Sequence, residues 1–252
     1  MILLVDAGNS RIKWRLQAQG KVLSAGALPT SACAGLPGAW HGFQARAACV
    51  CSVAGEKVDA AIRQGLDQVL VRGAGQAHVV NWLVSQAQAH GVDNLYEPAS
   101  ALGPDRYAAL VAARRRQEIG WVVVNVGTAM TADMLAADGR YLGGVILPGP
   151  DLMRRALDRG TAGVRPEGAL DAVDPPRNTR AAVNRGIAWA LWGGVEGMKR
   201  HLELVEGRPS RVMLSGGGRN VLAPMLEGEV TEVDELVLEG LGWIARDLGY
   251  DA

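Results

Sequence analysis

The sequence predicts an α/β protein built from two related domains, with an active-site cleft between them. At its start, the apolar run Ile2–Val5 has the length and composition of a buried strand and leads into a polar turn. That opening also recurs: a shift of 119 positions places Ile2–Pro29 on Trp121–Pro148 without a gap. A repeat that keeps both turn glycines and the closing proline indicates two halves of common design.

Each copy predicts a three-stranded meander: strand, glycine turn, strand, second glycine turn at Gly20 or Gly139, and strand. After the first meander we expect a strand over Ala45–Val53, a helix over Lys57–Gly65, a strand over Gln68–Arg72, a helical region at Trp82 and Leu83, a loop over Val92–Arg106 and a helix over Tyr107–Gln117. After the second we expect a helix over Asp151–Arg159, a loop over Gly160–Pro176, a helix from Asn178 or Thr179 to about Leu202, a strand over Arg211–Leu214, a helix over Asn220–Leu226, a strand over Glu229–Val233 and a helix over Leu236–Leu248. Strands followed by helices in both halves favour domains of residues 1–118 and 119–252.

Composition and charge narrow the function classes. Of the 252 residues, 48% are apolar and 21% are charged, which is typical of a globular protein. The net charge is zero, so there is no electrostatic signature of nucleic-acid or anionic-membrane binding. Neither a signal peptide nor a run long enough for a membrane span is apparent, so we expect a cytoplasmic protein. The three cysteines, Cys33, Cys49 and Cys51, lack zinc-site spacing and are expected to pack in the interior.

The first turn has residues suited to phosphate and metal binding. Gly8 permits a tight turn, and Asn9 and Ser10 add short side chains and backbone N–H groups of the kind that cradle an anion. The Asp6 carboxylate beside them is suited to hold a hydrated cation near a phosphate. The alternative is an ordinary hairpin turn with solvated polar residues.

Two further stretches are candidates for chemistry. Tyr96, Asp105 and Arg106 stand together in a segment that is otherwise a loop by composition. Asp105 is a candidate base, and the alternative is that it caps the following helix, because Asp is favoured at that position. Ser215 and the three glycines after it suit the approach of an adenosine or ribose, although a plain strand-to-helix turn is the alternative. The role of Asp133 is left open.

Several motifs in a fixed order resemble those of one family. They are DAGNSRIKW, LGPDR, GTAMTAD, GRYLGGVILPG, the pair Asn178-Thr179, and SGGG. The paired halves, with Asp-x-Gly-Asn-Ser at the first turn and Gly-Thr at the second, resemble the actin and sugar-kinase fold, in which two RNase H-like domains flank a cleft. Together the motifs resemble the type III pantothenate kinases. The resemblance extends from Ile2 to about Gly218, so it covers most of the chain.

The resemblance implies an ATP-dependent phosphorylation of pantothenate to 4'-phosphopantothenate, the first step of coenzyme A biosynthesis, with Mg²⁺. It assigns Asp105 as the base and Arg106 as the residue that neutralises charge or holds substrate. The implied ATP-binding residues are Asp6, Ala7, Gly8, Asn9, Ser10, Arg11, Ile12, Lys13 and Thr128, and the implied substrate contacts are Tyr96, Gly103, Pro104, Asp105, Arg106 and Thr179. A homodimer is also implied, and the helix after Asn178 is apolar on more than one face.

Asn125 departs from the family pattern. The family's second-turn motif begins with an Asp that ligates a monovalent cation, K⁺ or NH₄⁺, and Asn125 stands at that position. An amide carbonyl can coordinate such a cation but brings no charge, so we expect a retained but weakened dependence. The alternative function is a nucleotide-binding regulatory or interaction protein of the same fold with weak or lost kinase turnover.

Overall fold

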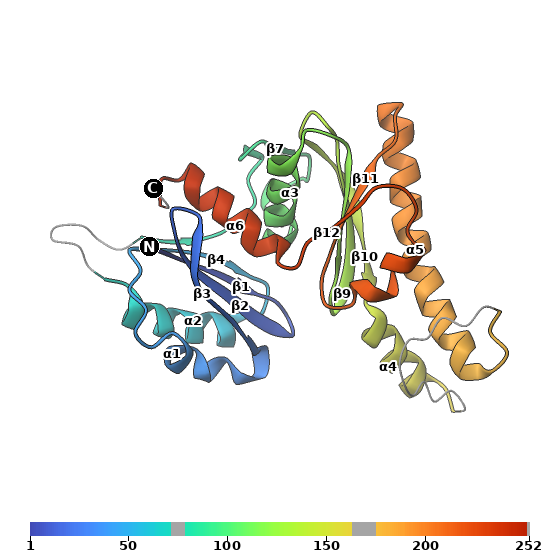
Figure 1. Ribbon diagram of the computed structural model, residues 1–252. Coiled ribbons are helices and arrows are strands. Elements are labelled where there is room, and N and C mark those ends of the chain that lie inside the picture. The colour runs from blue at the N-terminus through green and yellow to red at the C-terminus, as the bar shows by residue number, and fades with distance from the viewer. Residues whose placement is uncertain (72–78, 163–174, 251–252) are drawn as a thin grey trace. The chain divides into compact units, whose positions relative to one another are not determined.

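The computed structural model describes residues 1–71, 79–162 and 175–250. The chain folds as two compact units (Figure 1). The first unit comprises Met1–Arg116 together with Leu236–Ala252, and the second comprises Gln117–Glu235. Among the residues described, no helix is both long and apolar enough to cross a membrane.

The first unit is a five-stranded sheet with helices on both faces. Its elements are β1 (Ile2–Ala7), β2 (Arg11–Ala18), β3 (Lys21–Pro29), the 3-10 turn η1 (Thr30–Gly35), α1 (Leu36–Ala39), β4 (Ala47–Ser52), α2 (Glu56–Val69), β5 (Val79–Trp82), β6 (Gln88–Ala89), β7 (Val92–Asn94), η2 (Ala99–Ala101), α3 (Pro104–Arg116) and α6 (Leu236–Asp247). The sheet order is β3-β2-β1-β4-β5, with β1, β2 and β3 antiparallel and β1, β4 and β5 parallel.

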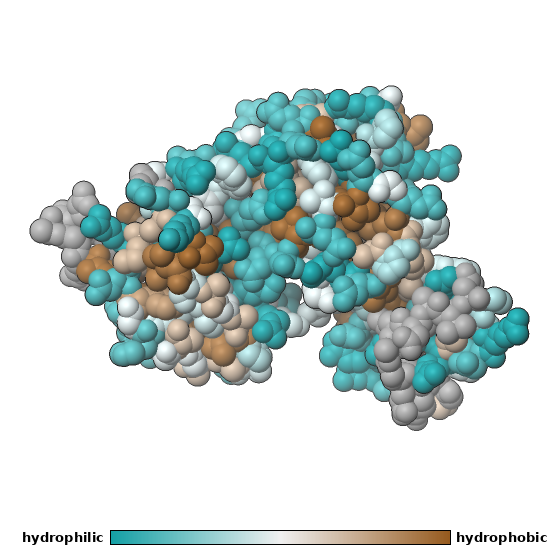
Figure 2. All heavy atoms as spheres, viewed as in Figure 1, coloured by the Kyte–Doolittle hydropathy of each residue, from teal (hydrophilic) through white to brown (hydrophobic). Residues whose placement is uncertain are grey.

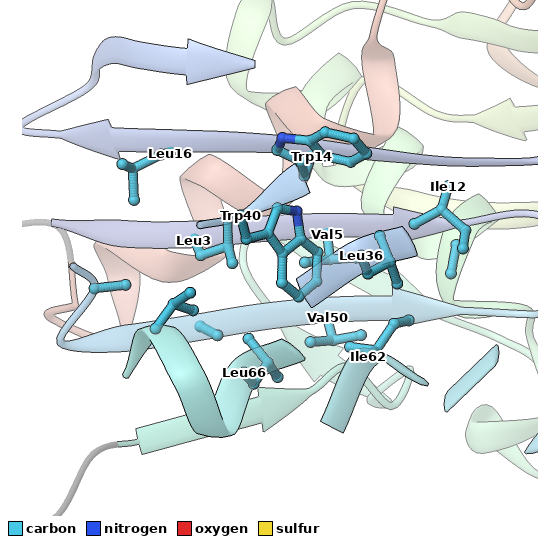
Figure 3. Packing of buried hydrophobic residues seen from close by; sticks show 14 of the residues in the cluster. Leu3, Val5, Ile12, Trp14, Leu16, Leu36, Trp40, Val50, Ile62 and Leu66 are labelled. Atoms are coloured by element: carbon cyan, nitrogen blue, oxygen red, sulfur yellow. The ribbon is translucent and has the colours of Figure 1, made fainter. Parts of the chain in front are cut away.

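The core of the first unit lies between this sheet and the helices α1 and α2. Alternate residues of β1 and β2, including Leu3, Val5 and Trp14, point into it and meet Leu36, Trp40, Ile62 and Leu66 (Figure 3). Trp14 and Trp40 meet edge to face, with ring centroids 6.1 Å apart. Period-two alternation then places the other residues of β1, Ile2, Leu4 and Asp6, on the opposite face, where α3 and α6 pack.

The second unit repeats the strand plan of the first. Its elements are β8 (Trp121–Val126), β9 (Ala129–Leu135), β10 (Arg140–Pro148), α4 (Pro150–Gly160), α5 (Thr179–Glu206), β11 (Arg211–Ser215), η3 (Arg219–Val221), η4 (Ala223–Met225) and β12 (Val230–Glu232). Its strands run β12-β11-β8-β9-β10, with the same parallel and antiparallel pairings. Even the irregularities correspond, because the third strand bulges at Leu23 in one unit and at Leu142 in the other. The predicted internal repeat is therefore confirmed.

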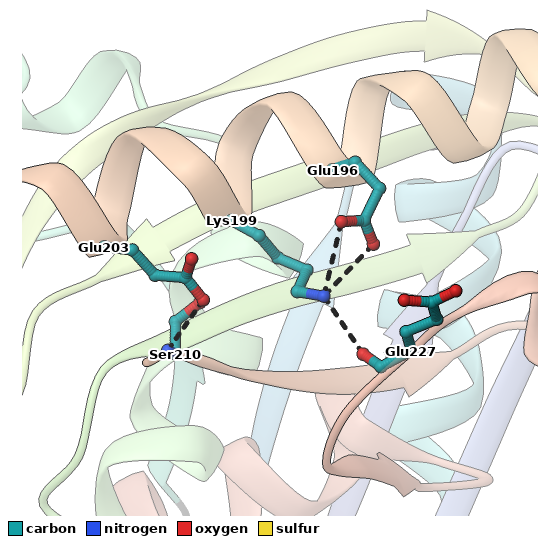
Figure 4. A network of polar contacts seen from close by, with 5 residues as sticks. All are labelled: Glu196, Lys199, Glu203, Ser210 and Glu227. Atoms are coloured by element: carbon teal, nitrogen blue, oxygen red, sulfur yellow. Dashed lines mark hydrogen bonds and ion pairs between the residues drawn. The ribbon is translucent and has the colours of Figure 1, made fainter. Parts of the chain in front are cut away.

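Helix α5 covers one face of the second sheet. Asn178 caps its first turn, accepting a 2.9 Å hydrogen bond from the Ala181 amide, and Gly207 ends it in the left-handed conformation. Lys199 joins the helix to the carbonyl of Glu227 at 3.0 Å and pairs with Glu196, while Glu203 accepts hydrogen bonds from Ser210 (Figure 4). These contacts fix α5 against the loops that enter β11 and β12.

Most of the expected elements are present, and several differ. Helix α2 continues to Val69, so the expected strand over Gln68–Arg72 is reduced to a bridge between Ala45 and Leu70, and Arg72 lies outside the described residues. Trp82 ends strand β5 and is not helical. The expected helix over Asn220–Leu226 is two 3-10 turns, and Pro224, the middle residue of η4, has no backbone N–H to donate to a continuous helix. The expected loop over Gly160–Pro176 falls largely outside the described residues.

The two units divide the chain differently from the expected domains of residues 1–118 and 119–252. Helix α6 packs against α3, β1 and β4 and so belongs to the first unit. Gly240 makes this approach possible: a Cβ there would lie 1.9 Å from the carbonyl oxygen of Ala108. The C-terminal segment therefore completes the first half of the chain.

Hydrophobic residues are also present on the surface. On the face shown in Figure 2 they form separate groups among hydrophilic residues. Among the described residues, the large apolar side chains that remain exposed include Trp189 and Trp192 of α5 and Leu152 and Leu157 of α4. Isolated exposed apolar residues are normal, but several on adjacent helices indicate an interaction surface.

Candidate active site

Asp6 lies at the carboxyl end of β1, the central strand of the first sheet. In the strand register it stands opposite Lys13 of β2 and beside Cys51 of β4. Its half-buried carboxylate lies on the face of the sheet that α3 and α6 cover. Carboxyl ends of parallel strands are common ligand positions in open α/β sheets. The fold therefore presents Asp6 where a ligand and a cation can reach it.

The turn after Asp6 is exposed and regular. The Gly8 amide donates a 3.0 Å hydrogen bond to the Arg11 carbonyl, and Asn9, Ser10 and Arg11 are exposed. Gly8 does not have a positive φ, and a Cβ there would make only an ordinary 3.5 Å contact with the Arg11 oxygen. Backbone strain thus does not require glycine at this position. The fold therefore does not explain why residue 8 is a glycine, whereas the close approach of a ligand to the backbone would explain it. Ala7 and Ile12 are buried beneath the turn.

Asp105 is the second residue of α3. Gly103 occupies the N-cap position, since its carbonyl accepts the Tyr107 amide at 3.0 Å, and Pro104 begins the helix. The alternative in which Asp105 is the N-cap is therefore wrong. Its carboxylate folds back toward Gly103, where a Cβ would lie 2.7 Å from Oδ1. The half-buried carboxylate lies at a helix N-terminus, where the helix dipole favours an acidic side chain.

Arg106 is buried next to Asp105, and Tyr96 holds its guanidinium. Nη1 of Arg106 donates a 3.2 Å hydrogen bond to the Tyr96 hydroxyl, and the guanidinium lies 5.7 Å from the centre of the Tyr96 ring. Asn94 in turn fixes this loop, accepting from the Tyr96 amide at 3.1 Å and donating to the Ala99 carbonyl at 2.9 Å. The structure thus brings together Tyr96, Gly103, Pro104, Asp105 and Arg106, as the motif predicts.

The carboxylates of Asp6 and Asp105 both influence the thiol of Cys51. It is fully buried, and burial raises the pKa of its thiol well above the ordinary value, with further increases from the charges of Asp6 and Asp105. Both carboxylates are therefore near the same thiol, although they are far apart in the sequence. The neutral thiol adds no third negative charge between them. A candidate cation ligand and a candidate base thus face one region of the first unit.

The corresponding position of the second unit is Asn125, which is not an acid. It lies near the carboxyl end of β8, opposite Thr131 of β9 and beside Ser215 of β11. The cross-strand neighbours of Asn125 thus both bear hydroxyl groups, whereas those of Asp6 are a lysine and a cysteine. These neutral side chains offer oxygen atoms and bring no charge to the position. Thr128 follows in the turn and is half-buried.

Two glycine loops pack directly against the turn that contains Thr128. The Gly149 amide donates to the Thr128 carbonyl at 2.9 Å, and a Cβ on Gly149 would lie 2.1 Å from the Gly127 oxygen. On another side, Gly216 has φ of +96° and a Cβ there would lie 2.3 Å from the Val126 oxygen. The Ser-Gly-Gly-Gly motif thus has a structural reason, which is close approach to this turn. That reason leaves its expected contact with adenosine as a prediction.

Thr179 is the first residue of α5. It lines an apolar surface groove of about 590 Å³ between α4 and α5, together with Pro148, Met153, Ala156, Leu157, Ala182, Val183, Gly186 and Ile187. Pro148 of this groove directly precedes Gly149, which contacts the turn of Thr128. Asp133 lies in β9, where it is buried and accepts a 2.9 Å hydrogen bond from the Tyr141 hydroxyl. The structure gives it a partner in the fold, and its chemical role stays open.

Sequence reasoning gave no contact role to Thr30 or to Gly149, the last residue of the GRYLGGVILPG motif, yet both contact the turns. Thr30 donates hydrogen bonds to the turn after β1, and Gly149 donates one to the turn after β8. The signal was available, because the 119-residue shift places Thr30 on Gly149. Both follow the proline that closes a meander, one residue beyond the segment that was aligned.

The fold and the glycine turns define a class, the actin and sugar-kinase fold. A Campylobacter jejuni structure assigned to the Baf family of transcriptional activators superposes with a TM-score of 0.63 at 20% identity, covering 98% of each chain. A Sinorhizobium meliloti structure assigned as a 2-dehydro-3-deoxygalactonokinase gives 0.55 at 16% identity, covering 98% and 99%. Identities this low establish the fold alone.

The sequence comparisons identify the family. The family model for type III pantothenate kinase matches residues 2–201. Proteins named type III pantothenate kinase from Aromatoleum aromaticum and Azoarcus sp. are 40% and 41% identical, covering 98% and 97% of this chain and 98% and 90% of theirs. A further relative with this name, from Thiobacillus denitrificans, is 39% identical over 97% of this chain and 96% of its own length. The chain belongs to the type III pantothenate kinase family, whose chemistry requires ATP as co-substrate and typically a divalent metal.

The residues at the first turn fit these requirements. No cluster of three His, Cys, Asp or Glu side chains that could hold a metal occurs in the part of the chain that is described. Mg²⁺ in phosphoryl-transfer sites is usually held by one or two carboxylates plus substrate phosphates and water. Asp6 beside an exposed glycine turn supplies such a carboxylate.

Proposed function

We propose that this protein transfers the γ-phosphoryl group of ATP to the primary hydroxyl of pantothenate, forming 4'-phosphopantothenate. The observation that carries the proposal is its membership of the type III pantothenate kinase family at about 40% identity over nearly the whole chain. The association of Asp6 and Asp105 with Cys51 supports it, because both carboxylates that the reaction needs are present in one unit. The regulatory alternative is not favoured, since its sequence support is Asn125 alone.

The residues divide the reaction between them. The turn over Asp6–Lys13 binds the ATP phosphates through backbone N–H groups. Asp6 would hold hydrated Mg²⁺, and the ion would supply positive charge to the phosphates. Asp105 accepts the proton of the substrate hydroxyl. At the same time the hydroxyl oxygen bonds to the γ-phosphorus, and the bond between the γ-phosphorus and the bridging oxygen breaks to release ADP. Arg106, oriented by Tyr96, stabilises the charge that develops. Thr128 adds a phosphate contact, and Gly103, Pro104 and Thr179 contact pantothenate.

The decisive experiment measures ADP formation by the purified protein with Mg·ATP, with and without pantothenate. We expect pantothenate-dependent turnover, and mass spectrometry should show one phosphate added to pantothenate. Homologous alcohols such as pantetheine serve as specificity controls. ATP hydrolysis that is indifferent to pantothenate, under all cations tested, would instead support a nucleotide-dependent regulatory protein.

The monovalent cation belongs to the same proposal. An amide at position 125 offers a carbonyl dipole, whereas a carboxylate would also attract the cation by charge. Activity should therefore rise with added K⁺ or NH₄⁺, with a high half-maximal concentration. Asn125→Asp should lower that concentration and leave the ATP requirement nearly unchanged. Flat titrations in both proteins would show that this site does not use a cation.

We also infer a homodimer formed through the exposed face of α5. This face combines the small residues Ala190, Gly193 and Gly197 with Trp189 and Trp192, and a Cβ on either glycine would meet open space. A helix of this length extends about 42 Å, enough to bury an area typical of stable interfaces against a second copy. Light scattering at micromolar concentration should give twice the chain mass, and Gly193→Glu should give the monomer. A wild-type monomer would exclude this assembly.

A further inference from the structure

Thr30 makes two hydrogen bonds to the turn after β1. Its hydroxyl donates to the Gly8 carbonyl at 2.9 Å, and its amide donates to the Ser10 carbonyl at 3.0 Å. Thr30 directly follows Pro29, the last residue of β3, so the third strand of the meander reaches back to the first turn. Both bonds therefore link the first turn to a residue that is distant in sequence.

These two bonds set the orientation of the turn's amide groups. In a planar trans peptide, the C=O and the next residue's N–H point in opposite directions. Because the Gly8 carbonyl points to Thr30, the N–H of Asn9 points away from it. Because the Ser10 carbonyl also points to Thr30, the N–H of Arg11 likewise points away from Thr30. Thr30 therefore holds two amide donors, those of Asn9 and Arg11, pointing away from itself, and amides fixed in this way can contribute to an anion-binding nest.

The second unit supports this interpretation independently. Gly149, the counterpart of Thr30 in the repeat, donates its amide to the Thr128 carbonyl at 2.9 Å. There the turn is tighter, since the Gly127 amide bonds to Ala129 where the Gly8 amide bonds to Arg11. A Cβ on Gly149 would lie 2.1 Å from the Gly127 oxygen, so the second unit has no room for a side chain at this position. The contact recurs although the turn and the residue type differ.

The two hydrogen bonds of Thr30 differ in which residue types could make them. The bond from its amide continues the ladder between β2 and β3, where Arg11 pairs with Pro29, and any residue except proline would make it. The bond from its hydroxyl is not part of any ladder and requires Ser or Thr. A purely structural turn would need only the first bond, and the second is the one that holds the Gly8 peptide.

We infer that Thr30 is a positioning residue for the nucleotide phosphates, acting through its hydroxyl on the Gly8–Asn9 peptide. This rests on the proposed function, in which the turn binds ATP. Thr30 itself does not touch the phosphates. Its loss should weaken nucleotide binding and leave the binding of pantothenate unaffected.

The test compares the near-isosteric Thr30→Val with Thr30→Ser, which keeps the hydroxyl. The affinity for Mg·AMP-PNP is measured by calorimetry, and kcat and both KM values are measured by ADP release. Thr30→Val should raise the Kd for Mg·AMP-PNP and the KM for ATP about three- to tenfold, the range for loss of one hydrogen bond. Thr30→Ser should stay within about twofold of the wild type, and the KM for pantothenate should not change. Thr30→Ala repeats the test if the valine variant folds poorly.

Thr161→Val is the matched control. The Thr161 hydroxyl also donates to a backbone carbonyl, that of Leu157 at 2.8 Å, at the end of α4. An unchanged Kd in Thr30→Val, or equal losses in both valine variants, would overturn the inference. If the wild type binds Mg·AMP-PNP but does not phosphorylate pantothenate, the proposed function fails while the Kd comparison still decides the role of Thr30. No nucleotide binding by the wild type would reject both.

Discussion

At the scale of single residues, the expected chemistry depends on where two carboxylates lie. Asp6 lies near the end of β1 and Asp105 is the second residue of α3, and the charges of both raise the pKa of the buried Cys51 thiol. The pair is assembled from β1 and α3, which are separated by most of the first unit. Substitutions at each position should therefore separate chemistry from folding.

Asp105→Asn should leave the fold and nucleotide affinity nearly intact and lower kcat by a factor on the order of 100 or more, because the amide cannot accept the substrate proton. Steady-state kinetics and thermal unfolding measure the two effects. Asp151→Asn is a matched control, since α4 also begins with Pro followed by Asp in its first turn. Should both variants lose stability equally with no separate loss of kcat in Asp105→Asn, Asp105 would only stabilise the helix N-terminus.

The buried cysteines make stability depend on alkaline pH. Burial raises the pKa of the Cys49 thiol from 9.0 to about 12 and raises the pKa of the Cys51 thiol well above its ordinary value. In the unfolded chain each thiol ionises near its ordinary pKa, whereas the folded state holds it neutral, so unfolding releases protons above pH 9. Stability is therefore full below about pH 9 and falls as pH rises toward 12, by at most about 1.4 kcal/mol per pH unit per thiol. Urea unfolding at pH 8 to 10.5 should show a shallower slope for Cys49→Ala, and equal slopes would contradict this origin.

At the scale of elements, the meander does more than supply three strands. Its third strand ends next to the first turn, so the residue after the closing proline contacts that turn in both units. The bulges at Leu23 and Leu142 accommodate the register that this return requires. The turns thus gain rigidity from residues about 20 positions further along the chain.

Gly149→Ala tests this element. A Cβ at 2.1 Å from the Gly127 oxygen cannot be accommodated without moving the turn, and overpacking of this kind costs about 1–3 kcal/mol. We expect a lower melting temperature and at least tenfold weaker kcat/KM for ATP. Gly160→Ala, at the end of α4 where a Cβ meets open space, should behave as the wild type. If the two variants behave alike, the contact with Gly127 has no role in the turn.

At the scale of the whole molecule, the chain returns to its first unit at its end. Helix α6 buries Leu238, Leu241 and Ile244 and packs against α3, β1 and β4. The sheet face that bears Asp6 is thus covered by a segment from the far end of the sequence. The first unit cannot complete its interior until the last helix has been synthesised.

Truncation before Leu236 should therefore destabilise the first unit selectively. Hydrogen exchange followed by mass spectrometry should show lost protection in β1 and β4, while β8 and β9 retain theirs. A truncation after Asp247, which keeps all of α6, is the matched control. Retained protection of β1 and β4 in the shorter protein would show that α6 is dispensable for this unit.

The sequence alone was sufficient for the fold class, for both meanders and for the family. These depend on local period-two patterns, on turn glycines and on a gap-free repeat, all of which are visible in one chain. It was less reliable for short elements such as the expected strand over Gln68–Arg72 and the expected helical region at Trp82, because a few residues carry little periodicity and their pairing partners decide their conformation.

Tertiary structure decided what local pattern cannot contain. The effect of both Asp6 and Asp105 on Cys51, the place of α6 in the first unit and the bonds from Thr30 to the first turn all involve residues that are distant in sequence. Such contacts depend on the pairing and packing of elements, which a single sequence does not specify residue by residue. Asp105 shows both sides: its motif marked it as a candidate base, but only the helix geometry, with Gly103 at the N-cap, removed the alternative of a capping residue.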